Sequence, residues 1–210
     1  MNIPPSGLEG DLVVPAHASG IVLFAHGSGS SRHSPRNQHV AEMLRQSGLG
    51  TLLLDLLPPD EGAADERTAH LRFNIDLLAT RLIEAVDWLS ADAATARLRL
   101  GCFGASTGAA AALVAAARRP DNVRAVVSRG GRPDLAGPAL ALVDAPTLLI
   151  VGGRDYSVVD LNRHAFEQLR CDKDLHIVPG ATHLFEEPGA LDKVAELAGD
   201  WFVTYLHAAG

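Results

Sequence analysis

The sequence predicts an α/β protein with a mostly parallel sheet and helices on both of its faces. Short apolar runs alternate along the chain with segments of helical periodicity, which is the order of elements in a parallel sheet. Runs such as Ile21 to Ala25 are continuously apolar, as strands buried on both faces are. The length of 210 residues suits one domain of about 200 residues. We therefore expect residues 1–210 to form a single domain.

The first half of the chain is expected to supply three strands and two helices. The strands are predicted at Leu12 to Val14, Ile21 to Ala25 and Thr51 to Leu54. Ser34 is a suitable N-cap and Pro35 suits the first helical position, so a helix is expected from there to about Ser47. Asp55 to Glu66 combines prolines, a glycine and several acids, which predicts an exposed loop. A long helix follows, because apolar residues recur at three- and four-residue spacing. They are Leu71, Ile75, Leu78, Leu82, Val86 and Leu89.

The second half repeats the alternation of strand and helix. Strands are predicted at Leu98 to Phe103, Val123 to Val127, Thr147 to Val151 and Leu175 to Val178. Helices are predicted at Ala109 to Ala117, Val158 to Leu169 and Leu191 to Leu206. Only a short connection separates Val127 from Thr147. No cap domain is therefore expected.

Composition narrows the classes of partner. A formal charge of −7 argues against nucleic acid or an anionic membrane, since both favour basic patches. The two cysteines, Cys102 and Cys171, are too few and too differently placed for a disulfide framework or a zinc site. The first residues lack a basic n-region, and no apolar run approaches the roughly 18 residues of a membrane span. We expect a cytoplasmic protein without metal or organic cofactor.

Gly104-Ala105-Ser106-Thr107-Gly108 carries the chemistry that the sequence indicates most clearly. It matches the nucleophile-elbow pattern G-x-S-x-G between a predicted strand and an alanine-rich helix. A serine hydroxyl is a weak nucleophile unless a base activates it, and such a turn lifts the hydroxyl clear of the sheet. The two glycines allow neighbouring backbone to approach the turn closely. The pattern alone also fits an ordinary strand-helix turn.

Further candidate residues follow other predicted strands, at the sheet edge where ligands bind in parallel sheets. Asp155 and His183 come after the last two strands, so the chain order Ser, Asp, His is that of α/β-hydrolases. His183 would serve as general base and Asp155 would orient it. Asp134 is the main alternative acid, and Asp160 a lesser one. His26 is expected to brace its loop.

The sequence resembles α/β-hydrolases of the dienelactone-hydrolase-like group, more narrowly small hydrolases also seen fused to phosphoribosyltransferase domains. The similar stretches are HGSGSSRHSPRN at 26–37, GASTGAAAAL at 104–113, VSRGGRPDLAG at 127–137 and PGATHLFEEPGAL at 179–191. The resemblance implies an α/β-hydrolase fold, a triad of Ser106, Asp155 and His183, and an oxyanion hole at Ser28 and Thr107. Dienelactone hydrolases proper use a cysteine nucleophile, whereas this elbow holds serine. The resemblance therefore implies ester hydrolysis more than action on dienelactone itself.

Three arginines at predicted strand ends, Arg32, Arg129 and Arg132, could hold an anionic substrate by bidentate hydrogen bonds. The alternative is that each pairs with a local carboxylate such as Asp134 or caps a helix.

We expect the protein to be a carboxylesterase, that is, a serine hydrolase whose partner molecules are small ester substrates. Thioester or lactone hydrolysis, and a non-catalytic ligand-binding role, are the alternatives. Short acyl groups are expected to be preferred, because no insertion supplies a covered apolar surface for a long chain. A homodimer is possible, and any link to a phosphoribosyltransferase is only an association.

Overall fold

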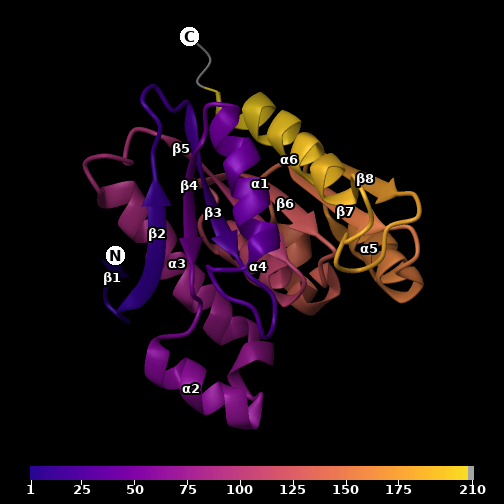
Figure 1. Ribbon diagram of the computed structural model, residues 1–210, viewed down its shortest axis with the longest axis horizontal. Helices are drawn as coiled ribbons and strands as arrows, with labels where there is room; N and C mark the ends of the chain where they lie inside the picture. Colours follow the sequence, from indigo (N-terminus) through magenta and orange to yellow (C-terminus); the bar gives the residue numbers. More distant parts are fainter. Residues whose placement is uncertain (208–210) are drawn as a thin grey trace.

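A computed structural model describes residues 1–207 and contains an eight-stranded sheet (Figure 1). The strands are β1 (Asn2–Ile3), β2 (Leu8–Val13), β3 (Gly20–Ala25), β4 (Gly50–Leu54), β5 (Arg99–Ala105), β6 (Val123–Arg129), β7 (Thr147–Gly152) and β8 (Lys173–Val178). Their order across the sheet is β1-β2-β4-β3-β5-β6-β7-β8. β2 runs antiparallel to β1 and β4, and all pairings from β4 to β8 are parallel. The predicted, mostly parallel sheet is confirmed.

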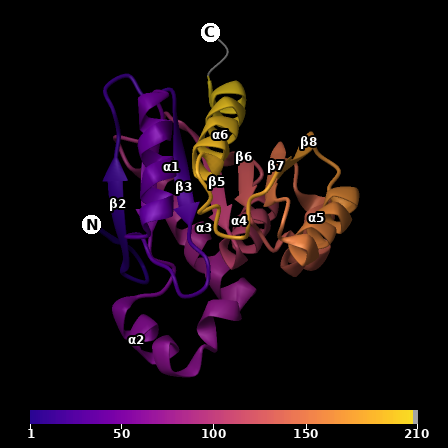
Figure 2. The same cartoon turned by 45° about the vertical axis from the view of Figure 1, so that its right-hand side comes forward.

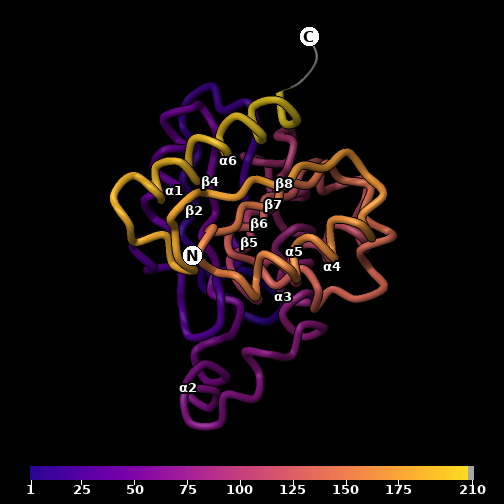
Figure 3. The backbone as a smooth tube through the Cα atoms, turned by 90° about the vertical axis from the view of Figure 1, so that its right-hand side faces the viewer, coloured from indigo at the N-terminus to yellow at the C-terminus, as the bar shows by residue number. Residues whose placement is uncertain are grey.

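Helices cover both faces of this sheet, as predicted. The helices are α1 (Pro35–Gln46), α2 (Pro59–Thr68), α3 (Ile75–Ala91), α4 (Thr107–Arg118), α5 (Tyr156–Gln168) and α6 (Ala190–Leu206), with 3₁₀ segments η1 (Leu71–Phe73) and η2 (Pro133–Leu142). α1 and α6 pack with the sheet in one hydrophobic cluster, and α3 and α4 pack in another. The view in Figure 3 shows these two groups of helices on opposite sides of the strands.

The helix that follows the elbow lies close to the sheet. Every residue from Thr107 to Ala116 is buried, and small alanine side chains let the helix axis approach the strands. β3 beside it is buried along its whole length. These two elements, with β5, fix the edge at which the candidate site lies.

The segment from Asp55 to Glu66, predicted to be an exposed loop, is mostly helical, and that prediction was wrong. α2 occupies Pro59–Thr68 and projects beyond the edge of the sheet at which β4 ends (Figures 1 and 2). Pro59 opens the helix, and Asp60 and Glu61 lie in its first turn, where the helix dipole favours acids. Apolar periodicity could not reveal this helix, because the one residue it buries is Asp65.

Other boundaries shift by a few residues. The first predicted strand extends back to Leu8 and ends at Val13, because its backbone pairs with both β1 and β4. The long helix begins at Ile75, where Asn74 accepts a hydrogen bond from the Leu77 amide at 3.1 Å. η2 occupies the connection between β6 and β7, and no cap domain is present within residues 1–207. Across the same residues, no helix is both long and apolar enough to cross a membrane.

Candidate active site

Ser106 occupies a strained turn between β5 and α4. Its φ of 50° and ψ of −122° lie in a region that non-glycine residues rarely adopt, which costs about 1–3 kcal/mol. The turn is packed tightly on its flanks. A methyl group on Gly104 would lie 2.4 Å from Ala109 Cα, and one on Gly108 would lie 2.3 Å from the Ala25 carbonyl oxygen. Both glycines are therefore required by close backbone contacts, as the sequence pattern predicts.

His183 and Asp155 form a hydrogen bond at the ends of β8 and β7. His183 Nδ1 lies 2.6 Å from Asp155 Oδ2, and Asp155 is the less exposed partner, with 14% of its side chain accessible against 39% for His183. A carboxylate can only accept, so Nδ1 carries the proton and Nε2 has a free lone pair when the ring is neutral. This is the tautomer that a general base needs.

The two alternative acids lie elsewhere. Asp134 accepts two hydrogen bonds from Arg132, at 2.9 Å from Nε and 2.8 Å from Nη2. Asp160 lies on α5 and pairs with Arg163 at 3.4 Å. The structure therefore brings Asp155, and neither Asp134 nor Asp160, to the histidine.

The β6–η2 loop contacts both the serine and the histidine. The Ser106 amide donates to the Arg129 carbonyl at 3.3 Å, and the Arg132 amide donates to the Ser106 carbonyl at 3.0 Å. A methyl group on Gly130, between those two arginines, would lie 3.5 Å from His183 Nδ1. Within residues 1–207 no hydrogen bond joins the Ser106 hydroxyl to His183. Such bonds often tighten only when substrate binds.

The backbone amides of Thr107 and Ser28 lie on two elements that flank the serine. Thr107 is the first residue of α4, so its amide has no partner inside the helix. Ser28 belongs to the loop between β3 and α1, and it lines the same cavity as Thr107. The structure thus brings the two predicted oxyanion-hole residues to one surface.

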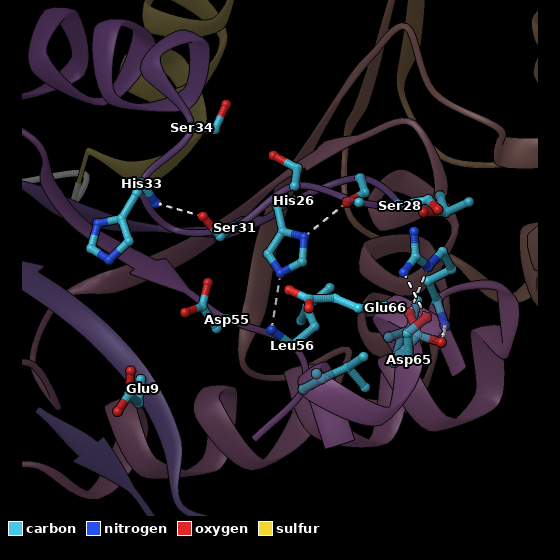
Figure 4. A pocket seen from close by; sticks show the side chains of 18 of the residues that line it. Glu9, His26, Ser28, Ser31, His33, Ser34, Asp55, Leu56, Asp65 and Glu66 are labelled. Atoms are coloured by element: carbon cyan, nitrogen blue, oxygen red, sulfur yellow. Dashed lines mark hydrogen bonds and ion pairs between the residues drawn. The ribbon is translucent and has the colours of Figure 1, made fainter. Parts of the chain in front are cut away.

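His26 braces the loop that carries Ser28 (Figure 4). The Leu56 amide donates to His26 Nε2 at 3.1 Å, so the ring proton is on Nδ1, which donates to the Gly27 carbonyl at 2.9 Å. Burial lowers the pKa of His26, and its hydrogen bond to Gly27 and the charge of Asp55 oppose that effect only in part. A neutral ring is the form that these two contacts need.

A cavity of about 830 Å³ lies beside the elbow, between the loop after β3, the start of α1 and the helix α2. Ser28 and Thr107 line it, whereas Ser106, Asp155 and His183 are not among its lining residues. Figure 4 shows polar side chains on several sides of it, including His33, Asp65 and Glu66. The cavity therefore meets the candidate site at the two oxyanion-hole residues.

Two of the three predicted substrate-binding arginines are held by carboxylates. Arg32 pairs with Asp55, with Glu9 at 2.8 Å and with Asp11 at 3.5 Å. Arg132 pairs with Asp134, as described above. These contacts correspond to the local pairing that the sequence left open as the alternative.

Arg129 differs from both. The residue is only 7% exposed, and its Nε and Nη1 have no hydrogen-bond partner among residues 1–207. Burial, and then the nearby charge of Arg36, lower the pKa of Arg129 to about 10. The guanidinium is therefore still charged at neutral pH.

Two residues that the sequence did not suggest support the site. Glu187 accepts from the Thr182 amide at 3.1 Å with each carboxylate oxygen, which fixes the loop that holds His183 and lowers the pKa of Glu187. Asp65 accepts from Arg72 Nε and from the Leu71 amide, both at 2.6 Å, and so holds α2 beside the cavity. Asp65 belongs to no motif, and Glu187 lies in the 179–191 stretch, which by itself indicates no role for this residue.

A resident metal has no ligand set in the described part of the chain. No group of three or more His, Cys, Asp or Glu residues within residues 1–207 is arranged to hold a metal ion.

The sheet order, the strained serine between strand and helix, and the strand-end histidine and aspartate define an α/β-hydrolase fold. Comparison with known proteins supports the same class. The model of the Dienelactone hydrolase family matches residues 10–205. The chain therefore belongs to the dienelactone hydrolase family, and hydrolase activity is what this membership supports.

Similar proteins include a solved structure and a curated relative of high identity. The crystal structure of dienelactone hydrolase from Anabaena variabilis is 61% identical, with a TM-score of 0.96, over 98% of this chain and 95% of that one. A Mycobacterium tuberculosis (strain H37Rv) protein named "Putative phosphoribosyl transferase" is 58% identical over 206 residues. Those residues are 98% of this chain and 46% of the relative, so the chain spans about half of that protein's length.

Est1E from Butyrivibrio proteoclasticus shares the fold at much lower identity. The two chains are 17% identical with a TM-score of 0.79, and the match covers 97% of each.

Proposed function

We propose that the protein hydrolyses small carboxylic esters through an acyl-enzyme on Ser106. The observation that carries the proposal is the 2.6 Å hydrogen bond between His183 and Asp155, next to a serine held in a strained elbow. A nucleophile, a base and a group that orients the base are the three parts that serine-dependent acyl transfer needs.

The reaction proceeds in two halves. Ser106 Oγ attacks the ester carbonyl carbon while His183 Nε2 takes the hydroxyl proton, and the alcohol leaves with that proton. Water then attacks the acyl-enzyme while His183 takes a proton from it; this proton passes to Ser106 Oγ as the carboxylic acid leaves, which regenerates the free serine. Asp155 holds the imidazole in the Nδ1-protonated tautomer and stabilises its charged form. Both halves pass through a tetrahedral oxyanion.

The amides of Ser28 and Thr107 stabilise that oxyanion. Two donors aimed at the developing charge, away from bulk water, are typically the largest contribution to catalysis in such sites. His26 serves the reaction indirectly, since its two hydrogen bonds fix the loop that carries the Ser28 amide.

Substrates are expected to be short or polar. The helix α2 closes one side of an 830 Å³ cavity, which the sequence did not suggest. The polar side chains His33, Asp65 and Glu66 on the cavity wall favour the expected preference for short acyl groups. A long acyl chain gains roughly 0.8 kcal/mol per methylene only where apolar walls remove it from water.

A panel of 4-nitrophenyl esters, a matched thioester and a lactone tests the proposal. The protein should hydrolyse the short esters, and Ser106→Ala should abolish the reaction to background. Faster turnover of the thioester at equal acyl length would instead favour a thioesterase, and preference for the lactone a dienelactone-type hydrolase. Binding without turnover of any member would indicate a non-catalytic role.

A further inference from the structure

Arg129 is a buried cation whose hydrogen-bonding groups are not satisfied. Its exposed fraction is 7%, and no partner for Nε or Nη1 is found in the described chain, residues 1–207. An unpaired buried charge is costly in a folded protein. Buried polar groups are almost always hydrogen-bonded, and the exceptions often mark a functional site.

Other arginines near the candidate site differ from Arg129, because each of them pairs with a carboxylate. Arg32, Arg72 and Arg132 lie near the same edge of the sheet, and each has a carboxylate partner. Arg129 has none among residues 1–207. A purely structural arginine at this position would be expected to have such a partner as well.

The position of Arg129 ties it to the candidate site. It is the last residue of β6, opposite Ala105 in the register, and its carbonyl accepts the Ser106 amide at 3.3 Å. Alternation along the strand places its side chain on the same face as Ala125 and Val127, which α1 and α6 cover. The backbone of Arg129 thus lies beside Ser106, and its side chain lies on the face of the sheet that α1 and α6 cover.

Arg36, on the first turn of α1, provides a second cation beside it. The charge of Arg36 acts on Arg129 strongly enough to lower its pKa, and Arg36 Nε is also buried without a partner among residues 1–207. Arg36 lines the same cavity as Ser28 and Thr107. Its ion pair with Glu186, at 3.3 Å, is exposed. Arg129 and Arg36 together have three buried nitrogen atoms without a partner among residues 1–207, and they form a site that an anion would complete.

We propose that Arg129 and Arg36 bind an anionic group of the substrate, a carboxylate or a phosphate-like oxyanion, and so select negatively charged esters. The inference rests on the proposed ester hydrolysis and adds a substrate class to it. Charge-assisted hydrogen bonds from the Arg129 guanidinium to the oxygens of such an anion would satisfy its buried N–H groups. Arg36 lines the cavity that Ser28 and Thr107 also line, so an anion held by Arg36 lies in the same cavity as the two oxyanion-hole residues.

Matched aryl esters test the charge preference. The neutral substrate is 4-nitrophenyl pentanoate, and its anionic counterparts are mono(4-nitrophenyl) succinate and 4-nitrophenyl 3-phosphonopropanoate. Arg129→Met should lower kcat/KM for the anionic esters about tenfold or more and change the neutral ester less than about twofold, as loss of a charge-assisted hydrogen bond predicts. The two anionic arms show whether carboxylate or phosphonate is preferred. Arg118→Met, which removes an exposed arginine paired with Asp76, is the charge control and should leave the ratio unchanged.

Thermal unfolding separates this role from a structural one. Because the guanidinium is buried without a partner, Arg129→Met should keep or raise the Tm, whereas Arg32→Met should lower it by removing three ion pairs. A fall in Tm for Arg129→Met as large as for Arg32→Met would overturn the proposal.

Two further outcomes keep this inference distinct from the function it builds on. If the parent protein hydrolyses the neutral ester but shows no preference for the anionic ones, the anion site is wrong and the esterase stands. If no ester is hydrolysed, calorimetry with succinate and inorganic phosphate decides the matter. Binding to the parent that Arg129→Met abolishes supports the site, and no binding of either anion refutes it.

Discussion

Replacing Asp155 with asparagine should lower kcat for ester hydrolysis while leaving the Tm near that of the parent. Asp155 Oδ2 is the group that His183 Nδ1 contacts, at 2.6 Å. An asparagine amide can instead donate to Nδ1, which would move the ring proton to Nε2 and remove the lone pair that Ser106 needs. Loss of a triad acid lowers kcat by about 10⁴ in a serine protease that serves as the model case. That factor corresponds to about 5 kcal/mol of transition-state stabilisation.

The assay is steady-state hydrolysis of a short 4-nitrophenyl ester, with Asp134→Asn as the matched control. Asp134 contacts Arg132 in a partly exposed pair, and such pairs contribute about 0–1 kcal/mol to stability. The control should therefore retain kcat within a few-fold, and both variants should unfold near the parent's Tm. If Asp134→Asn lost more activity than Asp155→Asn, the assignment of the acid would be wrong.

Three further predictions follow from other parts of the site. His26→Ala should cost about 1–3 kcal/mol, since the Leu56 amide loses its acceptor. The pKa of His26 is lowered by folding, so the parent's free energy of unfolding should fall as the pH drops below about 6.5, and that fall should be smaller in His26→Ala denaturation curves. Gly108→Ala should destabilise the protein by about 1–3 kcal/mol or more because its methyl group would lie 2.3 Å from the Ala25 carbonyl, whereas Gly62→Ala, with no atom within 4 Å, should be neutral or stabilising. Across an acyl series, kcat/KM should plateau or decline beyond short chains; a steady rise, or a jump above the critical micelle concentration, would reveal a lipid site.

The sheet and most helices could be predicted because their signals are local. Runs such as Ile21 to Ala25 are apolar throughout, and the structure buries each of those residues. The N-cap at Ser34 is confirmed, with its hydroxyl accepting the Asn37 amide at 3.4 Å. The elbow glycines are required by contacts with adjacent backbone that the strand-turn-helix order already implies.

The missed features leave no signal in the pattern of apolar residues. α2 forms without an apolar face, because Asp65 is buried against Arg72 and the Leu71 amide. The three arginines at strand ends look alike in the sequence, yet Arg32 and Arg132 meet carboxylates and Arg129 meets none in the described chain. No periodicity distinguishes a paired from an unpaired arginine, since the difference lies in which residues folding places beside it.

Labelling with an active-site fluorophosphonate, followed by peptide mapping, tests whether Ser106 is the activated nucleophile. The reagent phosphonylates a serine only where a neighbouring base activates it. We expect one modification, on Ser106, that is absent in Ser106→Ala and strongly slowed in His183→Ala. Labelling of another residue, or equal labelling of Ser106→Ala and the parent, would contradict it.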